Sequence, residues 1–198
     1  MTLAFKPLEL KRLNRRMEFH DPVAREDKVT MNSAAALVMT DLYRTGAVTV
    51  GAHASLSEAN NHMIINGVRM LLVTDESNKV MGLITATDIL GEKPLHYVNQ
   101  HGVNHSDIQV GDIMTPHDEL EVLCWTDVET ARVGDIAETL KRVGRQHAIV
   151  VDGEVDAQKI RGIFSSSQIA RETGEEVDTS SCAGSFAELG HALMHDVA

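Results

Sequence analysis

The sequence predicts an α+β fold made of two copies of a βαββα unit. The main observation is that helix, glycine, strand, turn, strand and helix signals follow one another twice in the same order, in residues 55–90 and 132–171. In addition, each copy is preceded by a short apolar strand signal and a Met-Thr pair. A unit of about 50 residues with one small sheet buries too little surface to be stable alone, so the two copies are expected to share a core.

The first copy begins with a helix. Ser55 with Glu58 three residues later is the capping-box pattern that starts a helix. Gly67 stands where that helix would end, because only glycine enters the left-handed conformation freely. Between these two ends, apolar residues recur at helical spacing: Leu56, Ala59 and Met63.

Two strands and a second helix follow in the first copy. The apolar runs 70–73 and 80–84 have the length and composition of buried strands. Residues 75–78, Asp-Glu-Ser-Asn, form a turn cluster between them. Residues 85–88, Thr-Ala-Thr-Asp, then open the next helix.

The second copy repeats these signals in the same order. Gly144 ends the helix, 148–151 and 160–164 are the paired strands, and Ser165-Ser166-Ser167-Gln168 opens the last helix. The helical spacing is carried by four apolar residues: Val133, Ile136, Ala137 and Leu140.

The pattern divides the chain into five parts. Strands at 47–50 and 120–124 lead into the two copies, each after a Met-Thr pair in a helix or turn. The predicted parts are an N-terminal arm (1–32), a first domain (33–93), an irregular linker (94–108), a second domain (109–174), and a polar hinge with an amphipathic C-terminal helix (175–198).

Several segments together resemble a known family. They are "VMTDLYRTGAVTV", "INGVRMLLVTDESNKVMGLITATDIL", "VGDIMTP", "GRQHAIVVD" and "RGIFSSSQIAR". In this order the sequence resembles a tandem pair of cystathionine β-synthase (CBS) domains, the arrangement called a Bateman module. The resemblance implies two three-stranded sheets flanked by helices, packed with pseudo-two-fold symmetry around two clefts. It also implies binding of AMP, ADP, ATP or S-adenosylmethionine in these clefts, and a homodimer.

The family's ribose motif is Ser/Thr-x-x-Asp, matched here by Thr85, Thr87 and Asp88. A carboxylate at a strand-to-helix junction can accept two charge-assisted hydrogen bonds from a ribose diol. The hydroxyl of Thr85 and the helix N-terminal amides suit a phosphate. The same spacing is also a plain N-capping arrangement, which stabilises the helix without any ligand.

The second copy departs from the motif, because Gln168 replaces the aspartate after Ser165. A neutral amide loses the charge-assisted part of the bond, about 1 kcal/mol, so this site is expected to be weak or empty. Phosphates also need cations. The resemblance points to Arg69 in the first copy, and to Arg145 and His147 in the second, although surface positions are an equal alternative.

Composition excludes several classes of function. A formal net charge of −11 and the absence of a long basic stripe argue against nucleic acid and anionic membranes as partners. No apolar run approaches the roughly 18 residues of a membrane span, and residues 1–16 lack the apolar stretch of a secretion signal, so a cytoplasmic location is expected.

No catalytic or metal motif stands out, so the chain is expected to be neither an enzyme nor a metal-binding protein. Cys124 lies in an apolar strand signal, where an inert buried thiol is expected. Trp125 favours packing at the core or its rim over base stacking. The histidines at 96, 101 and 105 fall in the irregular linker, so no helix is expected to fix them as ligands.

Three functions remain open. The first is a regulatory sensor that binds AMP, ADP or ATP beside Asp88 and moves another element, with the C-terminal helix as the candidate. The second is a ligand-free dimeric scaffold that binds a protein effector, which the change to Gln168 favours. A detached regulatory subunit of an enzyme or transporter is a third reading.

Overall fold

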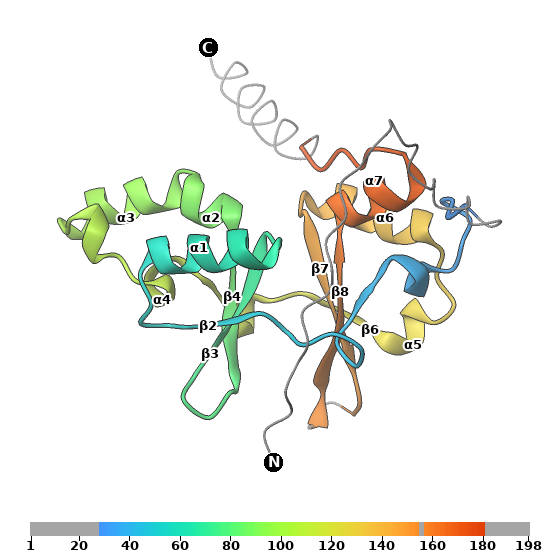
Figure 1. The fold of residues 1–198 in the computed structure, drawn as a ribbon, viewed down its shortest axis with the longest axis horizontal. Helices are drawn as coiled ribbons and strands as arrows, with labels where there is room; N and C mark the ends of the chain where they lie inside the picture. The colour runs from blue at the N-terminus through green and yellow to red at the C-terminus, as the bar shows by residue number, and fades with distance from the viewer. Residues whose placement is uncertain (1–27, 155–156, 181–198) are drawn as a thin grey trace, which may run out of the picture.

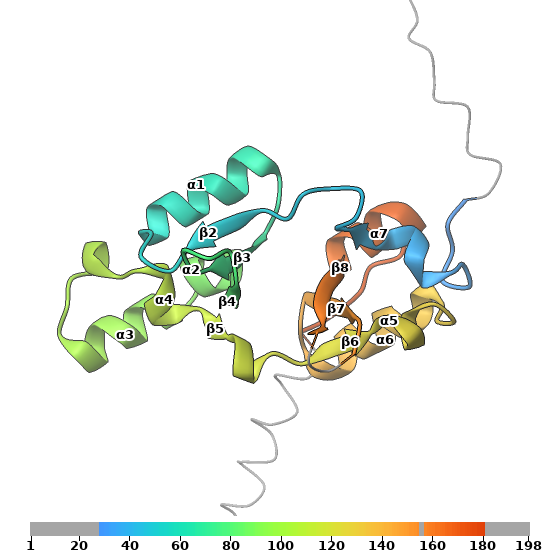
Figure 2. The ribbon, with the colours of Figure 1, turned by 90° about the horizontal axis from the view of Figure 1, so that it is seen from below.

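The computed structural model describes residues 28–154 and 157–180, which form two α/β units side by side (Figure 1). Each unit contains a four-stranded mixed sheet. The two sheets face each other in the middle of the molecule, and most helices lie on the outer sides (Figure 2). The α+β fold of two repeated units predicted from the sequence is confirmed.

The first unit follows the predicted order. Its elements are β2 (Thr49–Gly51), α1 (Leu56–Asn66), β3 (Met70–Thr74), β4 (Val80–Thr85) and α2 (Ala86–Leu90). Ser55 and Glu58 form the expected capping box of α1, and Gly67 ends the helix in the left-handed conformation with a φ of 63°. β2 pairs in parallel with β3, and β3 pairs antiparallel with β4.

The segment between the repeats is more regular than the sequence suggested. It contains α3 (Lys93–His101), η2 (His105–Asp107), α4 (Val110–Ile113), β5 (Thr115–Pro116) and η3 (His117–Glu119). The expectation that no regular helix holds the histidines of the 94–108 linker is therefore wrong for His96 and His101, which lie in α3. Pro94 stands in the first turn of α3, where its missing N–H is tolerated, and Gly102 ends the helix with a φ of 70°.

The second unit has the same order and the same pairing. Its elements are β6 (Val122–Cys124), α5 (Trp125–Val128), α6 (Val133–Val143), β7 (His147–Asp152), β8 (Lys159–Ser165) and α7 (Ser166–Thr173). Gly144 ends α6 with a φ of 65°, as its counterpart Gly67 ends α1. β6 pairs in parallel with β7, and β7 pairs antiparallel with β8.

Each sheet receives its fourth strand from the segment that precedes the other repeat. η1 (Ala35–Val38) and β1 (Thr40–Asp41) precede the first repeat, yet β1 pairs with β8 of the second. β5 precedes the second repeat and pairs with β4 of the first. The three-stranded sheets implied by the resemblance therefore have four strands, and the exchange ties the two units together.

The Met-Thr pairs and the glycines of the central strands are two halves of one packing arrangement. A methyl group at Gly82 would overlap the carbonyl oxygen of Thr115, close to the sulfur of Met114. A methyl group at Gly162 would overlap the side chain of Met39. Glycine is thus needed at Gly82 because the backbone of the exchanged strand β5 lies directly across β4, whereas a side chain at Gly162 would have to displace the Met39 side chain.

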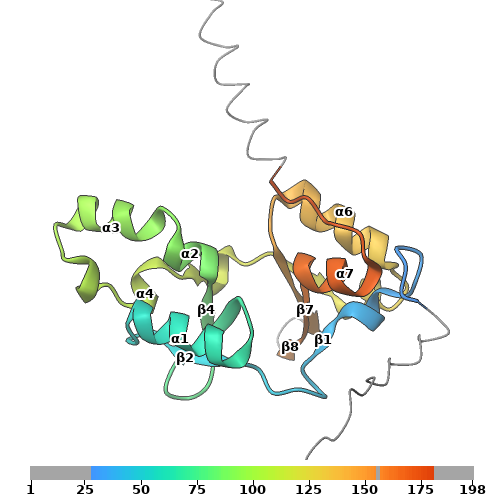
Figure 3. The ribbon, with the colours of Figure 1, turned by 45° about the horizontal axis from the view of Figure 1, so that its top comes forward.

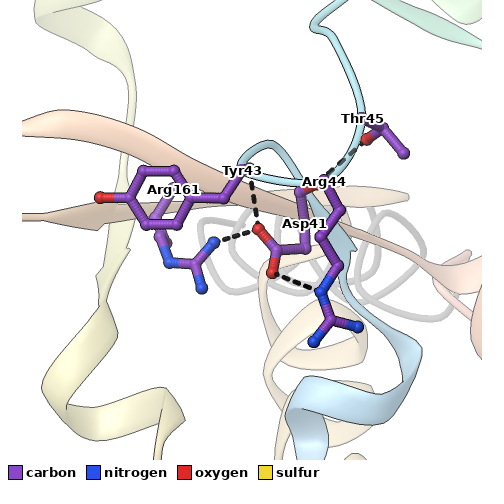
Figure 4. A network of polar contacts seen from close by, with 5 residues as sticks. All are labelled: Asp41, Tyr43, Arg44, Thr45 and Arg161. Carbon is purple, nitrogen blue, oxygen red and sulfur yellow. Dashed lines mark hydrogen bonds and ion pairs between the residues drawn. The ribbon is translucent and has the colours of Figure 1, made fainter.

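A network around Asp41 fixes the exchanged strand β1 on the second unit (Figure 4). The Asp41 carboxylate accepts hydrogen bonds from the Arg161 guanidinium and, at 2.9 Å, from the Tyr43 amide, which lowers the pKa of Asp41. The guanidinium also stacks on the rings of Tyr43, 4.0 Å from the centroid, and Trp125, 4.8 Å away. Trp125 packs at the edge of the second core, which agrees with its predicted packing role.

Two cores lie inside the units and a third lies between them. The internal cores are built on α1, β3 and β4 in the first unit and on α6, β7 and β8 in the second. The third joins the two sheets through the buried residues Met70, Leu72, Ile149 and Val151. The expected shared core is therefore present, and it sets the relative position of β3 and β7.

Two predicted parts lie largely or wholly outside the described residues. These are the N-terminal arm, described only from residue 28, and the C-terminal helix predicted after residue 184. Within the described ranges, no helix combines the length and apolar character needed to cross a bilayer.

Candidate functional site

A cavity of about 400 Å³ lies between the two units, beside the junction of β4 and α2. Both units contribute to its walls, and so does the chain that follows α7. The lining residues are Leu83, Thr85, Thr87, Asp88, Thr115, Leu120, Glu121, Gly144, Arg145, Gln146, His147, Ile149, Thr179 and Ser180. This volume lies within the range of small-molecule sites, about 300–1,000 Å³.

The Thr-x-x-Asp motif reaches the cavity because β4 ends at Thr85 and α2 begins directly after it. Thr85 is the N-cap of α2, and its Oγ1 accepts a hydrogen bond from the Asp88 amide at 3.2 Å. In return, Asp88 Oδ2 accepts bonds from the Thr85 amide at 2.8 Å and from Thr85 Oγ1 at 2.7 Å. The motif therefore does form the N-cap of α2, and these hydrogen bonds fix the Asp88 carboxylate at the cavity wall.

The second oxygen of the Asp88 carboxylate is also engaged. Lys93 at the start of α3 places its Nζ 2.7 Å from Asp88 Oδ1 and donates to the carbonyl oxygen of Ile113 at 3.3 Å. The Asp88 side chain is 13% exposed and the Lys93 side chain 47%. A ribose diol that binds Asp88 with both hydroxyls would therefore have to compete with Lys93, whose side chain is half exposed.

The cation that lines the Asp88 cavity comes from the other unit. Arg145 lines the cavity and forms an ion pair with Glu121, with 3.1 Å between NH2 and Oε2. His147, at the start of β7, is partly buried and lines the same cavity. Burial and the positive charge of Arg69 lower the pKa of His147 to about 4, although Asp88 acts in the opposite direction. Its imidazole is therefore neutral at pH 7.

The second motif lies beside a separate, more open hollow. Ser166, Ser167, Arg69 and Gln146 line it, together with residues 176–180. Ser165 Oγ caps α7 by accepting from the Gln168 amide at 3.1 Å. The Gln168 side chain accepts from Arg171 at 2.6 Å, and neither Ser165 nor Gln168 lines this hollow.

The structure therefore regroups the predicted site residues. Thr85, Thr87 and Asp88 share one cavity with Arg145 and His147, which sequence reasoning assigned to the second site. Arg69, which it assigned to the first site, lines the hollow of the second motif. The regrouping follows from the packing of the two sheets face to face, which brings each junction against the opposite unit.

Sequence reasoning missed several lining residues. Thr115 comes from the exchanged strand β5, while Thr179 and Ser180 come from the segment after α7. Lys93 was missed as the partner of Asp88, although a lysine five residues after the motif was a usable signal. Gln146 was also missed as a lining residue, and the only signal for it in the sequence was its position between Arg145 and His147.

The cysteine and histidines that the sequence singled out can be placed where the structure describes them. Cys124 is exposed, so the expectation of a buried thiol is wrong, because Cys124 ends the edge strand β6. In α3 the ring of His101 stacks on Tyr97, with centroids 4.1 Å apart. No group of three or more His, Cys, Asp or Glu residues with metal-binding geometry occurs among the described residues.

Comparison with known proteins defines the class. Residues 38–94 match the family model of the CBS domain. A conserved protein from Pyrococcus horikoshii has the same fold, with a TM-score of 0.53 and 23% identity, over 77% of this chain and 100% of that one. A CBS-domain-containing protein from Agrobacterium tumefaciens aligns with a TM-score of 0.52 and 21% identity, over 72% and 94%.

An archaeal protein from Methanocaldococcus jannaschii also shares the fold, with a TM-score of 0.51 and 22% identity, over 70% of this chain and 49% of that one. A search of the curated proteins finds no match. The first repeat thus matches the CBS-domain family, and the described chain has the fold of these solved structures, one of which is a CBS-domain-containing protein.

Proposed function

We propose that the chain is a regulatory module that binds an adenine nucleotide, AMP, ADP or ATP, in the cavity beside Asp88. Asp88 would accept hydrogen bonds from the ribose hydroxyls, and the side chains of Thr85, Thr87 and Arg145 would contact phosphate. The adenine ring would lie against the apolar part of the wall, which contains Leu83, Leu120 and Ile149.

The observation that carries this proposal is the composition of one cavity. A motif with an ionised acceptor comes from the first unit, and a cation with a neutral imidazole comes from the second. A nucleotide needs these groups together, with a carboxylate for the diol, a cation for phosphate and apolar surface for the base. From the sequence alone, the carboxylate was assigned to the first site, and Arg145 and His147 to the second.

We favour a regulatory role over catalysis because of how these groups are held. The Asp88 carboxylate serves as a helix cap and as the ion-pair partner of Lys93, so it is not poised as a general base. Since the cavity walls belong to both units, a ligand favours the relative positions in which both walls contact it. Binding in this cavity would therefore be transmitted as a change between the units.

We place this module in a cytoplasmic homodimer. The apolar residues Leu90 and Leu95, 73% and 62% exposed, flank a shallow hollow on the outer side of the first unit. Exposed apolar residues around a hollow are typical of association surfaces. Sedimentation at increasing concentration of the wild type and of Leu90→Asp measures this directly, and a purely monomeric wild type would contradict it.

A ligand-free dimeric scaffold that binds a protein effector is the second candidate. It is favoured by the engagement of both Asp88 oxygens with Thr85 and Lys93, and by the engagement of Gln168 with Arg171. Under this reading both junctions are purely structural. Partner binding would then be the same with and without nucleotide.

Isothermal titration with AMP, ADP and ATP separates the two candidates. We expect binding by the wild type and a loss of at least tenfold in Asp88→Ala, because charge-assisted hydrogen bonds contribute about 1.5–3 kcal/mol. Glu58→Ala is the matched control, since it breaks the equivalent capping box of α1 away from the cavity. Absence of heat with all three nucleotides, or equal affinities in the wild type and Asp88→Ala, would contradict the proposal.

A further inference from the structure

The segment after α7 passes along α6 towards the cleft between the units (Figure 3). We call residues 175–180 the C-terminal strap. Its direction is set where α7 ends: Gly174 has a φ of 79°, and the buried Thr173 hydroxyl accepts a hydrogen bond from the Glu175 amide at 3.1 Å. The same hydroxyl donates to the Ile169 carbonyl at 2.8 Å.

The strap is anchored by alternating residues. Val177 packs against the core of the second unit, and Thr179 is also partly buried, whereas Glu176, Asp178 and Ser180 are exposed. This alternation is that of an extended chain with one side on the protein. Residues 176–178 lie beside Ala137, Glu138 and Lys141 of α6.

The strap separates the two hollows. Thr179 and Ser180 line both the Asp88 cavity and the hollow beside Ser166, and Gln146 is the other residue common to both. Of these two hollows, Glu176 and Asp178 line only the one beside Ser166, and they also line the groove along α6. The strap thus presents hydroxyl groups to both hollows, and the Ser180 hydroxyl donates to the Asp178 carboxylate at 2.5 Å. It adds two carboxylates to the second hollow, where an anionic phosphate would be repelled. The two carboxylates that line the first hollow are instead paired with cations, Asp88 with Lys93 and Glu121 with Arg145.

We propose that the strap is part of the ligand site: Thr179 and Ser180 contact the nucleotide bound beside Asp88, and Glu176 and Asp178 keep nucleotide out of the hollow beside Ser166. This inference rests on the proposed function. It limits binding to one nucleotide per chain, and it makes the strap the element that senses occupancy of the cavity.

Titration of the full chain with AMP, together with hydrogen–deuterium exchange, tests the proposal. We expect one AMP per chain and slower exchange of the strap amides when AMP is bound. Thr179→Ala/Ser180→Ala should weaken binding about fivefold or more, which corresponds to roughly 1 kcal/mol of lost hydrogen bonding. Thr130→Ala, an exposed threonine remote from both hollows, is the control and should bind like the wild type.

Val177→Asp tests the anchor without reference to nucleotide. We expect faster exchange of the strap and of peptides containing Arg69 and Ser166, since the carboxylate cannot remain against the core. Unchanged exchange at Arg69 and Ser166 would overturn the proposed separation of the two hollows by the strap, even if AMP binds.

Two AMP per wild-type chain, or equal affinities in the wild type and the double alanine variant, would overturn the proposal as well. Absence of heat with AMP, ADP and ATP would instead refute the proposed function, and the Val177→Asp exchange result would still decide whether the strap divides the cleft.

Discussion

The two strand-to-helix junctions of the repeats have the same backbone arrangement and different side-chain chemistry. At the first, the Ala86 amide donates to the carbonyl oxygen of Arg69, and at the second the Ser166 amide donates to that of Gln146, both at 2.9 Å. A hydroxyl caps the helix in each. The first junction then carries a carboxylate paired with Lys93, and the second carries the amide of Gln168 paired with Arg171.

This comparison shows that the repeated fold supplies position, while single residues decide chemistry. Both junctions point towards the cleft, because the sheets pack face to face through the third core. Only the first presents an ionised acceptor together with a cation from the opposite unit. The strap adds a further difference, since its carboxylates lie on the side of the second junction.

The largest effect we expect is on stability, and it comes from the residue that pairs with each helix cap across the sheet. This residue is Met70 in β3, opposite Thr85, and His147 in β7, opposite Ser165. The pKa of His147 is lowered to about 4 by burial and by Arg69. Below the ordinary pKa near 6.5, the unfolded chain takes up a proton that the folded chain does not. The free energy of unfolding therefore falls as the pH falls from 6.5 to 4, and it is unaffected by this group above pH 7.

Chemical denaturation at pH 7 and pH 5 measures this effect in the wild type and in His147→Met. The wild type should lose about 2 kcal/mol more than the variant over this interval. The substitution gives the second unit the residue of the first, so it removes the titration and keeps an apolar side chain. Equal losses in the two proteins would show that His147 is protonated in the folded chain, and would break this part of the comparison.

A smaller effect is expected from the cations that pair with the two junctions. Lys93→Met should tighten AMP binding by a few-fold, because the ribose no longer competes with an ion pair at Asp88 Oδ1. Arg171→Met, the equivalent change at the second junction, should leave the affinity unchanged. Titration of both variants measures the difference, and weaker binding in Lys93→Met would mean that Lys93 itself contacts the nucleotide.

Much of the fold could be predicted because local signals decide it. The capping residues Ser55 and Thr85 and the left-handed glycines Gly67 and Gly144 act within one helical turn, so their spacing is visible in the sequence. The helix α3 was missed because Pro94 and Gly102 are read as breakers, although they mark its two ends. The exchanged strands β1 and β5 were missed because two residues are too few for a periodic pattern.

The candidate site could be predicted only in part. The Thr85–Asp88 motif was visible as a local pattern, and so was the loss of charge at Gln168. The grouping of Asp88 with Arg145 and His147 was not, because it depends on how two units pack. The Lys93 pair and the strap were missed for the same reason, since their contacts are made in space and leave no fixed spacing in the sequence.

A crystal structure of the full chain grown with AMP tests the central claim most directly. The account predicts one AMP per chain in the cavity beside Asp88, with the ribose hydroxyls on the carboxylate, Lys93 displaced from Oδ1, and Thr179 and Ser180 against the ligand. AMP in the hollow beside Ser166, or a cavity without AMP in which Asp88 still pairs with Lys93, would contradict it.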